Sequence, residues 1–143
     1  HIVGIPDQLD DILLEIRFLS LGDHCTIHGE MSDKEMFDLL NTMDIFMFLS
    51  DQTEDGDFEG FGIAVIEANL LGLPAIGSKD SGISDAIVNN RTGFLVNQKN
   101  NDQILESILR IIKDYNNFSK NAKQHALKYS WENVVDQYID LFN

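Results

Sequence analysis

Two glutamates in the stretch EGFGIAVIEANLLG, residues 59–72, are the strongest candidates for chemistry in this chain. Glu67 stands within an apolar run. Its neighbours at helical spacing are Ile63, Ala64, Leu70 and Leu71. This spacing predicts that Glu67 lies on the core-facing stripe of a helix. Burying a carboxylate costs free energy unless the carboxylate accepts hydrogen bonds. We therefore expect Glu67 to bind either a structural partner or the hydroxyl groups of a ligand.

Glu59 differs from Glu67 because it precedes the helix. Gly60 and Gly62 flank Phe61 and predict a helix that begins near residue 61. Acidic residues near a helix start complement its dipole, so Glu59 alone does not indicate a site. The free N–H groups of a helix start suit phosphate, and glycines let a ligand approach the backbone closely. Together these residues predict a ligand with phosphate groups near the helix start and a diol near Glu67.

The elements that would position the two glutamates alternate along the chain. Apolar segments predict strands at 2–5, 25–29, 44–50, 73–78 and 93–96. Helical patterns lie between them at 10–22, 31–43, from near residue 61 to 72, and at 83–87, and helices fill the chain from residue 101 onward. This alternation predicts an α/β fold, with a Rossmann-like parallel sheet flanked by helices and extra helices at the C-terminal end. In such sheets, ligands bind at the carboxyl ends of the strands.

Single residues add detail to this outline. Gly22 is expected to end the helix at 10–22. Ser32, followed three residues later by Glu35, predicts a capping box at the start of the next helix. The strand at 44–50 is apolar on both faces, which predicts a place in the interior of the sheet. Trp131, at the start of the last helix, is expected to pack against the rest of the domain.

Composition excludes several kinds of partner. The chain has 143 residues, a net charge of −14 and a single cysteine, Cys25. The negative charge argues against nucleic acid and against docking on anionic lipid. No apolar run approaches the roughly 20 residues of a membrane-spanning helix. One cysteine allows no internal disulfide, which suits a reducing compartment such as the cytoplasm. The histidines at 24, 28 and 125 lack the spacing of metal ligands, so no metal site is predicted.

The segment EGFGIAVIEANLLGLPAIGSKDSGISDAIVNNRTGFLV resembles the C-terminal domain of retaining GT-B glycosyltransferases of family 4, the glycosyl transferases group 1 family. Glu59 and Glu67, which are separated by seven residues, match the E-x7-E motif of that family. GLPAIGS matches the strand that follows, and RTGFLV matches a small hairpin beyond it. HGEMSDKEMFDLLNTMDIFMFLS matches the preceding segment, and YSWENVVDQYIDLF matches the closing helix. The resemblance covers nearly the whole chain.

This resemblance implies the C-terminal half of a GT-B fold, which binds the donor nucleotide sugar. Carried onto this chain, it places Glu67 on the ribose hydroxyls of the donor. It places Glu59, as the catalytic carboxylate, near the anomeric centre of the transferred sugar. Gly60, Phe61 and Gly62 would contact the sugar and diphosphate through their backbone N–H groups.

The resemblance has further implications for ligands and partners. His28 and Gly29, at the end of a strand, would lie near the nucleobase. No cofactor and no essential metal are implied. The partners would be a nucleotide-sugar donor and a glycan or lipid-linked acceptor, in the synthesis of a cell-surface polysaccharide such as capsule or lipopolysaccharide. The full-length protein would be cytoplasmic or peripheral at the inner membrane, with no direct insertion of this segment.

The chain also departs from the family pattern. SGISDAI stands where members carry Gly-Gly followed by a Pro-Glu pair, and Asp85 retains the acid. The basic phosphate-binding residues of the family, its first strand–helix unit and its N-terminal acceptor domain fall before HIVGI. We therefore expect residues 1–143 to be a partial C-terminal nucleotide-sugar-binding domain that does not transfer sugar by itself. A GT-B-like nucleotide-sugar epimerase and a non-catalytic sugar-nucleotide-binding module are the alternatives.

Overall fold

The structure, a computed structural model, describes residues 1–4, 8–50 and 61–141. These residues belong to two compact units, residues 1–41 and residues 42–143. Each unit contains its own parallel sheet with helices in the connections. The predicted α/β class is therefore confirmed.

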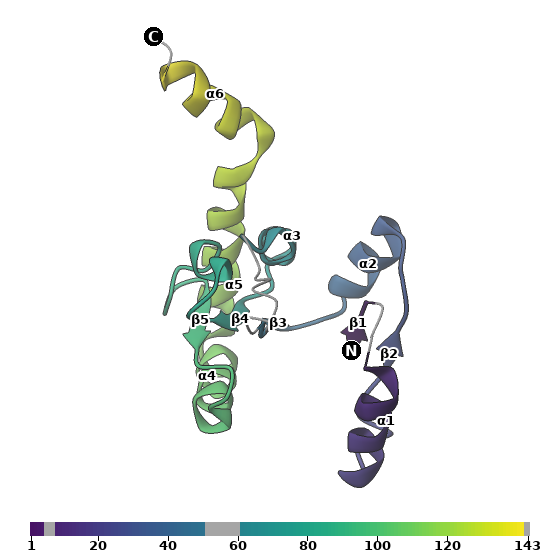
Figure 1. Ribbon diagram of the computed structural model, residues 1–143. Helices are drawn as coiled ribbons and strands as arrows, with labels where there is room; N and C mark the ends of the chain where they lie inside the picture. The colour runs from purple at the N-terminus through teal and green to yellow at the C-terminus, as the bar shows by residue number, and fades with distance from the viewer. Residues whose placement is uncertain (5–7, 51–60, 142–143) are drawn as a thin grey trace. The chain divides into compact units, whose positions relative to one another are not determined.

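The first unit is a strand–helix–strand–helix segment (Figure 1). Its elements are β1 (Ile2–Val3), α1 (Leu9–Phe18), β2 (Ile27–His28) and α2 (Asp33–Leu40). β1 and β2 pair in parallel, with Ile2 opposite Ile27 and Val3 opposite His28. α1 supplies the crossover that a parallel pair of strands requires.

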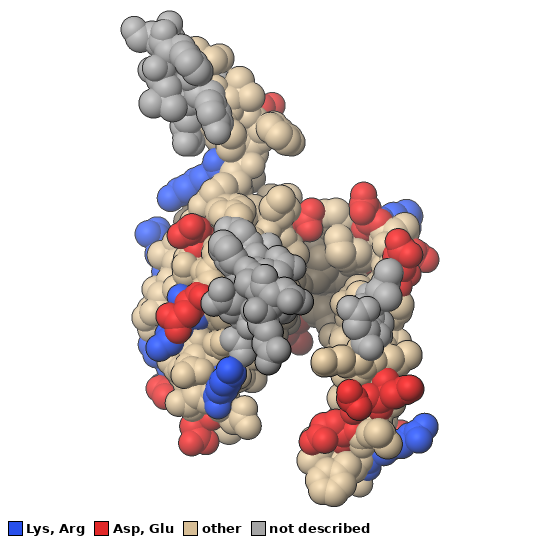
Figure 2. All heavy atoms as spheres, in the orientation of Figure 1, with Lys and Arg blue, Asp and Glu red and all other residues tan. Residues whose placement is uncertain are grey.

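The surface of the first unit carries much acidic charge on α1. Asp10 and Asp11 lie in its first turn, where they complement the helix dipole, and Glu15 follows one turn later. All three residues are exposed, and Figure 2 shows the acidic side chains gathered over this helix.

The two helices of the first unit differ in how well local sequence predicted their ends. The prediction that Gly22 ends α1 is wrong. Ser20 adopts the left-handed conformation with φ of 56°. Its N–H donates to the carbonyl of Arg17 at 3.0 Å, and the next N–H donates to the carbonyl of Ile16 at 2.9 Å. These two bonds form a Schellman motif, which closes the helix before the glycine is reached.

The capping box at the start of α2 is confirmed. The backbone N–H of Glu35 donates to Oγ of Ser32 at 3.4 Å, and the backbone N–H of Ser32 donates to Oε2 of Glu35 at 2.9 Å. Two N–H groups that have no partner within the helix are thereby satisfied by side chains.

The second unit carries a three-stranded sheet and most of the helices. Its elements are β3 (Phe46–Phe48), α3 (Ile63–Leu71), β4 (Ala75–Ser78), the short 3-10 helix η1 (Gly82–Asp85), β5 (Gly93–Val96), α4 (Asn101–Lys113), α5 (Tyr115–Ala126), the 3-10 helix η2 (Leu127–Tyr129) and α6 (Trp131–Leu141). The strand order is β3-β4-β5, and both pairings are parallel. The hairpin predicted around RTGFLV is therefore wrong, because β5 runs parallel to the strand before it.

The strand that is covered on both faces is β4 rather than β3. All four residues of β4 are buried. β3, predicted to lie in the interior, pairs only with β4 among the described residues, and Met47 is 44% exposed. The apolar composition of 44–50 was a correct sign of a strand but did not indicate its place in this sheet.

Two clusters of buried side chains pack on the sheet. The first comprises Val65, Ala75, Ile83, Ala86 and Ile87. The second comprises Ile76, Phe94, Val96, Ile111 and Phe118. Ala75 and Ile76 are adjacent in β4, so their side chains point to opposite faces. α3 and η1 therefore cover one face of the sheet, and α4 and α5 cover the other.

The last helix contributes little to this core. α6 follows η2 beyond the end of α5 (Figure 1). Trp131, expected to pack against the domain, is 84% exposed, and Val135 and Ile139 are also exposed. The expectation for Trp131 is therefore wrong. The helix itself begins as predicted, because Ser130 Oγ accepts a hydrogen bond from the backbone N–H of Asn133 at 3.4 Å.

Candidate functional site

The candidate site centres on the start of α3. Gly62 is the N-cap residue, with φ of 76° and ψ of 56°, so α3 begins at Ile63 rather than near residue 61. A Cβ atom on Gly62 would lie 3.4 Å from Cγ1 of Ile83, which is an ordinary contact. Glycine is therefore required here by its left-handed conformation rather than by lack of space. Because glycine has no side chain, this N-cap offers no side-chain acceptor to the first N–H groups of the helix.

Glu67 lies on a different face of α3 from the predicted one. The buried residues of α3 are Val65, Ala68 and Asn69. Ile63 and Leu70, which were expected to share the core face with Glu67, are 67% and 47% exposed. At 100° per residue, Glu67 is directed away from the buried face. The prediction that Glu67 belongs to the core-facing stripe is therefore wrong.

The carboxylate of Glu67 is accessible as a consequence of this placement. The side chain is partly buried, and it makes no hydrogen bond or ion pair with any other residue that the structure describes. It lies four residues after the first helical residue, which is about 6 Å along the helix axis at roughly 1.5 Å per residue. A ligand at the helix start could therefore reach both the first N–H groups and this carboxylate.

Phe61 directly precedes Gly62, and the two residues are called the glycine turn below. The ring of Phe61 makes aromatic contacts. Its ring lies 5.4 Å from the ring of Tyr129, at an interplanar angle of 53°. Tyr129 in turn contacts the edge of His125, with ring centroids 5.2 Å apart. Phe61 also packs against the first core cluster. The side chain of Phe61 is thus directed into the unit, which leaves its backbone as the part available to a ligand.

His125 lies in a partly desolvated place beside this aromatic contact. Burial lowers the pKa of His125, as does the positive charge of Lys128, whereas a hydrogen bond with the backbone of Ala86 raises it and Arg91 lowers it slightly. Nε2 of His125 is buried and has no hydrogen-bond partner among the described residues. Folding therefore shifts the protonation equilibrium of His125 toward the neutral imidazole.

Serines lie at the carboxyl ends of β3 and β4. Oγ of Ser78 donates to the carbonyl of Ser50 at 2.6 Å, and Oγ of Ser81 donates to the carbonyl of Ser78 at 3.3 Å. Oγ of Ser50 is buried and has no hydrogen-bond partner within the part of the chain that the structure describes. Lys79 is about half exposed, and its Nζ lies 3.9 Å from Asp80. This edge of the sheet is where ligands bind in open α/β folds.

The structure brings some of the sequence-predicted residues together and leaves others apart. Phe61, Gly62 and Glu67 lie within the first turns of α3, and Gly62 also lies against η1 through Ile83. Glu59 and Gly60 lie outside the described residues, so the positions predicted for them stay predictions. Tyr129 was not singled out in the sequence, because nothing in the local pattern links it to Phe61.

The residues predicted near the nucleobase belong to the first unit. His28 ends β2 and is partly buried, and Gly29 is exposed. Nε2 of His28 lies 2.8 Å from Nδ1 of His1, and the two rings stack with centroids 5.1 Å apart. The position of His28 at the carboxyl end of a strand agrees with the sequence prediction, while its contact with a nucleobase stays a prediction.

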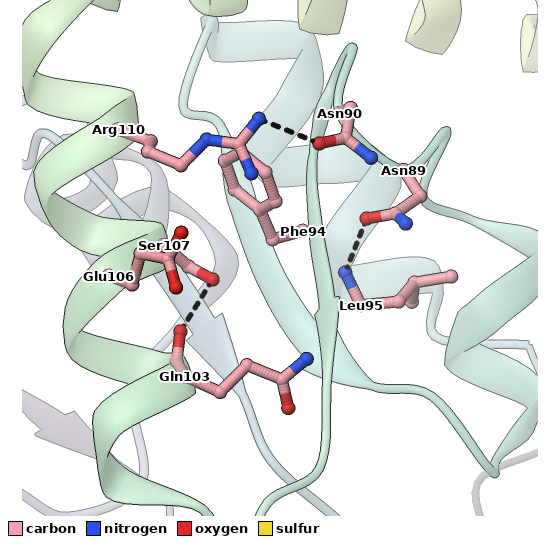
Figure 3. A pocket seen from close by; sticks show the side chains of 8 residues that line it. All are labelled: Asn89, Asn90, Phe94, Leu95, Gln103, Glu106, Ser107 and Arg110. Carbon is pink, nitrogen blue, oxygen red and sulfur yellow. Dashed lines mark hydrogen bonds between the residues drawn. The ribbon is translucent and has the colours of Figure 1, made fainter.

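A polar hollow of about 230 Å³ lies elsewhere in the second unit, between β5 and α4 (Figure 3). Arg110 is stacked on the ring of Phe94 at 4.5 Å and donates to Oδ1 of Asn90 at 2.9 Å. Oδ1 of Asn89 accepts from the backbone N–H of Leu95 at 3.0 Å. The hydrogen bond between Arg110 and Asn90 connects α4 to the turn before β5. None of the sequence-predicted site residues lines this hollow.

The described residues also include neither a cluster of metal ligands nor a membrane-spanning helix. Within residues 1–4, 8–50 and 61–141, no group of three or more His, Cys, Asp or Glu side chains is placed to hold a metal ion. None of the helices in the described part of the chain has the length and apolar character needed to cross a bilayer.

Comparison with known proteins identifies a family. A sequence profile described as glycosyl transferases group 1 matches residues 1–126. The amylovoran biosynthesis glycosyltransferase AmsK of Erwinia amylovora is 31% identical over 110 residues, which are 77% of this chain and 27% of AmsK. The lipopolysaccharide 1,2-N-acetylglucosaminetransferase of Salmonella typhimurium is 30% identical over 122 residues, which are 82% of this chain and 31% of that enzyme. The chain thus spans less than a third of the length of these two relatives.

Solved structures share the fold. HepE of Anabaena, in complex with UDP and glucose, superposes on 98% of this chain with a TM-score of 0.77, at 21% sequence identity. The matched part is 38% of the HepE chain. The arrangement of parallel strands and flanking helices is that of GT-B glycosyltransferases, as predicted.

Proposed function

The chain belongs to the glycosyl transferases group 1 family, and on that premise we propose that it forms the donor-binding part of a retaining glycosyltransferase. The observation that carries this proposal is the start of α3. A buried glycine in the left-handed conformation precedes the helix, and Glu67 follows one turn later, partly buried and with no hydrogen bond or ion pair to any described residue. A nucleoside diphosphate sugar presents anionic phosphates and a ribose diol that suit these two features.

Each residue near the helix start has a role in the proposal. The backbone of Gly60, Phe61 and Gly62 contacts the sugar and the diphosphate. The direction of the Phe61 ring supports this role, because the ring packs on Tyr129 and on the first core cluster, which leaves contact with a ligand to the backbone. Glu67 accepts hydrogen bonds from the two ribose hydroxyls, as acidic groups do in other nucleotide sites.

The chemical step in the proposal is transfer of the sugar from diphosphate to an acceptor hydroxyl. The bond from the anomeric carbon to the diphosphate oxygen breaks, a bond from that carbon to the acceptor oxygen forms, and the proton of the acceptor hydroxyl passes to the departing diphosphate. Negative charge develops on the leaving diphosphate, where the helix N–H groups stabilise it. Positive charge develops on the sugar ring, as in glycoside hydrolysis, and a carboxylate at Glu59 would favour it. The configuration at the anomeric carbon is retained.

The substrates in the proposal follow from the relatives. AmsK is named for amylovoran biosynthesis, and the Salmonella enzyme is named as a lipopolysaccharide N-acetylglucosaminetransferase. HepE was solved with UDP and glucose. We infer a UDP-sugar as donor and a glycan or lipid-linked acceptor in cell-surface polysaccharide synthesis. The transfer is expected to need no resident metal.

Donor titration tests this function. Titration calorimetry of the full-length protein with UDP-, GDP- and ADP-glucose should show binding of at least one donor. Glu67→Ala should weaken that binding about 10- to 100-fold, because hydrogen bonds to a charged group contribute roughly 1.5–3 kcal/mol. Glu132→Ala, which removes an exposed glutamate from the first turn of α6, is the matched control and should bind as the wild type does. Equal affinity of the Glu67→Ala and wild-type proteins would refute the ribose assignment.

A further inference from the structure

Tyr129 lies in η2, beyond the residues that the family profile matches, yet it contacts the turn that begins α3. Its ring packs on the ring of Phe61 with centroids 5.4 Å apart. Phe61 is followed directly by Gly62, the N-cap of α3. A residue near the C-terminal end of the chain therefore contacts the segment assigned to the donor sugar and diphosphate.

Tyr129 is itself held in place from two other directions. The ring of His125, one helical turn earlier, meets it edge-on at an interplanar angle of 74°. The hydroxyl of Tyr129 donates to the backbone carbonyl of Asp85 at 3.4 Å, which is a long hydrogen bond. The two contacts orient the tyrosine ring toward Phe61.

The hydrogen bond to Asp85 links Tyr129 to η1 as well as to Phe61. Asp85 is the last residue of η1, and Ile83 of the same short helix lies against Gly62. Tyr129 thus contacts Phe61, which precedes Gly62, and also η1, whose Ile83 lies against Gly62.

The turn needs such support because of its composition. Gly62 adopts a left-handed conformation that few residues favour, and glycine-containing backbone has more conformational freedom to lose on binding than any other. Binding to a segment that is already ordered avoids part of this entropic cost. An aromatic side chain adjacent to the glycine, held by a second aromatic ring, is a direct way to restrict the turn.

We propose that Tyr129 is a positioning residue for the donor site, which acts by holding Phe61 and, through it, the glycine turn at the start of α3. Tyr129 touches no substrate in this proposal. The inference rests on the proposed function, because it concerns the same turn. It adds a residue from η2 to the described part of the site, which comprises Phe61, Gly62 and Glu67.

The exposure of Tyr129 separates this role from simple core packing. Its side chain is 37% exposed, and it belongs to neither of the two core clusters. Removal of its ring should therefore loosen the turn without opening the core of the second unit. Trp131, two residues later, is another exposed aromatic residue, and its 84% exposed ring packs on no other ring in the described part of the chain.

The test compares variants of Tyr129 with a variant of Trp131 in the full-length protein. Calorimetry and initial rates with the UDP-, GDP- or ADP-glucose that binds the wild type give the donor affinity, KM and kcat. Tyr129→Ala should weaken donor binding about 3- to 10-fold and raise KM for the donor with little change in kcat, given the usual strength of an aromatic pair. Tyr129→Phe should stay within about twofold of the wild type, because the ring contact is retained. Trp131→Ala should leave donor binding unchanged.

Thermal unfolding of each variant shows whether its fold is intact. If Tyr129→Ala does not fold, Tyr129→Leu, which keeps apolar volume but not the ring, is measured in its place. Unchanged donor affinity in the folded Tyr129 variant would overturn the positioning role alone. An equal loss in Trp131→Ala would also overturn it. Absence of donor binding by the wild type would overturn the proposed function, and the inference with it.

Discussion

Gly93 of β5 lies opposite Ala75 of β4, and the backbone of Ala75 fills the place where a side chain at residue 93 would begin. A Cβ atom built on Gly93 would collide with the carbonyl oxygen of Ala75. Because the carbonyl oxygen belongs to the central strand and the glycine to the strand paired with it, neither can move without disturbing the pairing. The parallel pairing of β4 and β5 therefore leaves no room for a side chain at residue 93.

Gly93→Ala should therefore destabilise the second unit severely. We expect a loss of about 3 kcal/mol or more in the free energy of unfolding, because overpacking against backbone cannot relax as it does against a side chain. Gly72→Ala is the matched variant. A Cβ there would lie 2.6 Å from Cε of Lys123, the mobile end of an exposed side chain, and the left-handed conformation adds about 1–2 kcal/mol. Urea unfolding should rank Gly93→Ala as clearly the worse of the two, and the reverse order would contradict the close approach.

Gly62→Ala should affect both folding and ligand binding. A methyl group finds ordinary contacts with Ile83, so the cost comes from the left-handed conformation and should be about 1–2 kcal/mol. The shift of the turn should also weaken donor binding. Gly62→Asn should retain more stability than Gly62→Ala, because asparagine tolerates the left-handed region better. Equal stability of the two variants in urea unfolding would argue against a left-handed residue at this position.

Ser32→Ala should weaken the start of α2. The hydroxyl accepts the N–H of Glu35, and its loss also removes the 2.6 Å contact with the Glu35 carboxylate. Loss of an N-cap of this kind costs about 1 kcal/mol. Ser32→Asp, which keeps a capping acceptor, should recover most of the loss in thermal unfolding. If Ser32→Ala is as stable as the wild type, the capping box does not stabilise the helix in solution.

His125 should make stability depend on pH in a defined window. Its pKa in the folded protein is lowered from the ordinary value of 6.5, chiefly by burial. The unfolded chain therefore takes up a proton first as the pH falls, so the free energy of unfolding decreases below about pH 6.5 and stops changing below the folded pKa. His125→Gln should remove this part of the pH dependence. The difference in the free energy of unfolding between the wild type and His125→Gln should be constant above about pH 7.5. As the pH falls below that, any advantage of the wild type should become smaller or reverse.

Removal of divalent metals should not abolish donor binding. The family resemblance implies no essential metal, and donor affinity measured before and after treatment with EDTA should agree within about twofold, a small change on the scale of 1.4 kcal/mol per tenfold in affinity. A loss that is restored by Mg²⁺ or Mn²⁺ would contradict this expectation. Glu67→Ala measured in parallel shows that the assay detects a weakened site.

The sequence by itself determined the elements whose signals are local. The capping box of Ser32 and Glu35 formed as predicted, because it depends only on residues three apart. The alternation of strands and helices gave the α/β class, and the E-x7-E motif gave the family, since both are patterns in the order of residues. Even local signals competed, however. Ser20 ended α1 before Gly22 could, because a Schellman motif needs only a residue that tolerates a left-handed conformation.

Only the tertiary structure decided which face of α3 is buried. The sequence of α3 is apolar on nearly every side, so helical periodicity did not indicate which side faces the core. Either of two polar residues, Glu67 or Asn69, could have been on the buried face. Packing buried Asn69, whose amide Nδ2 donates to the carbonyl of Leu73 at 3.0 Å, and turned Glu67 outward. An amide with a hydrogen bond costs less to bury than a charge without one. The contact between Phe61 and Tyr129 was decided in the same way, because residues so far apart meet only when the helices pack on the sheet.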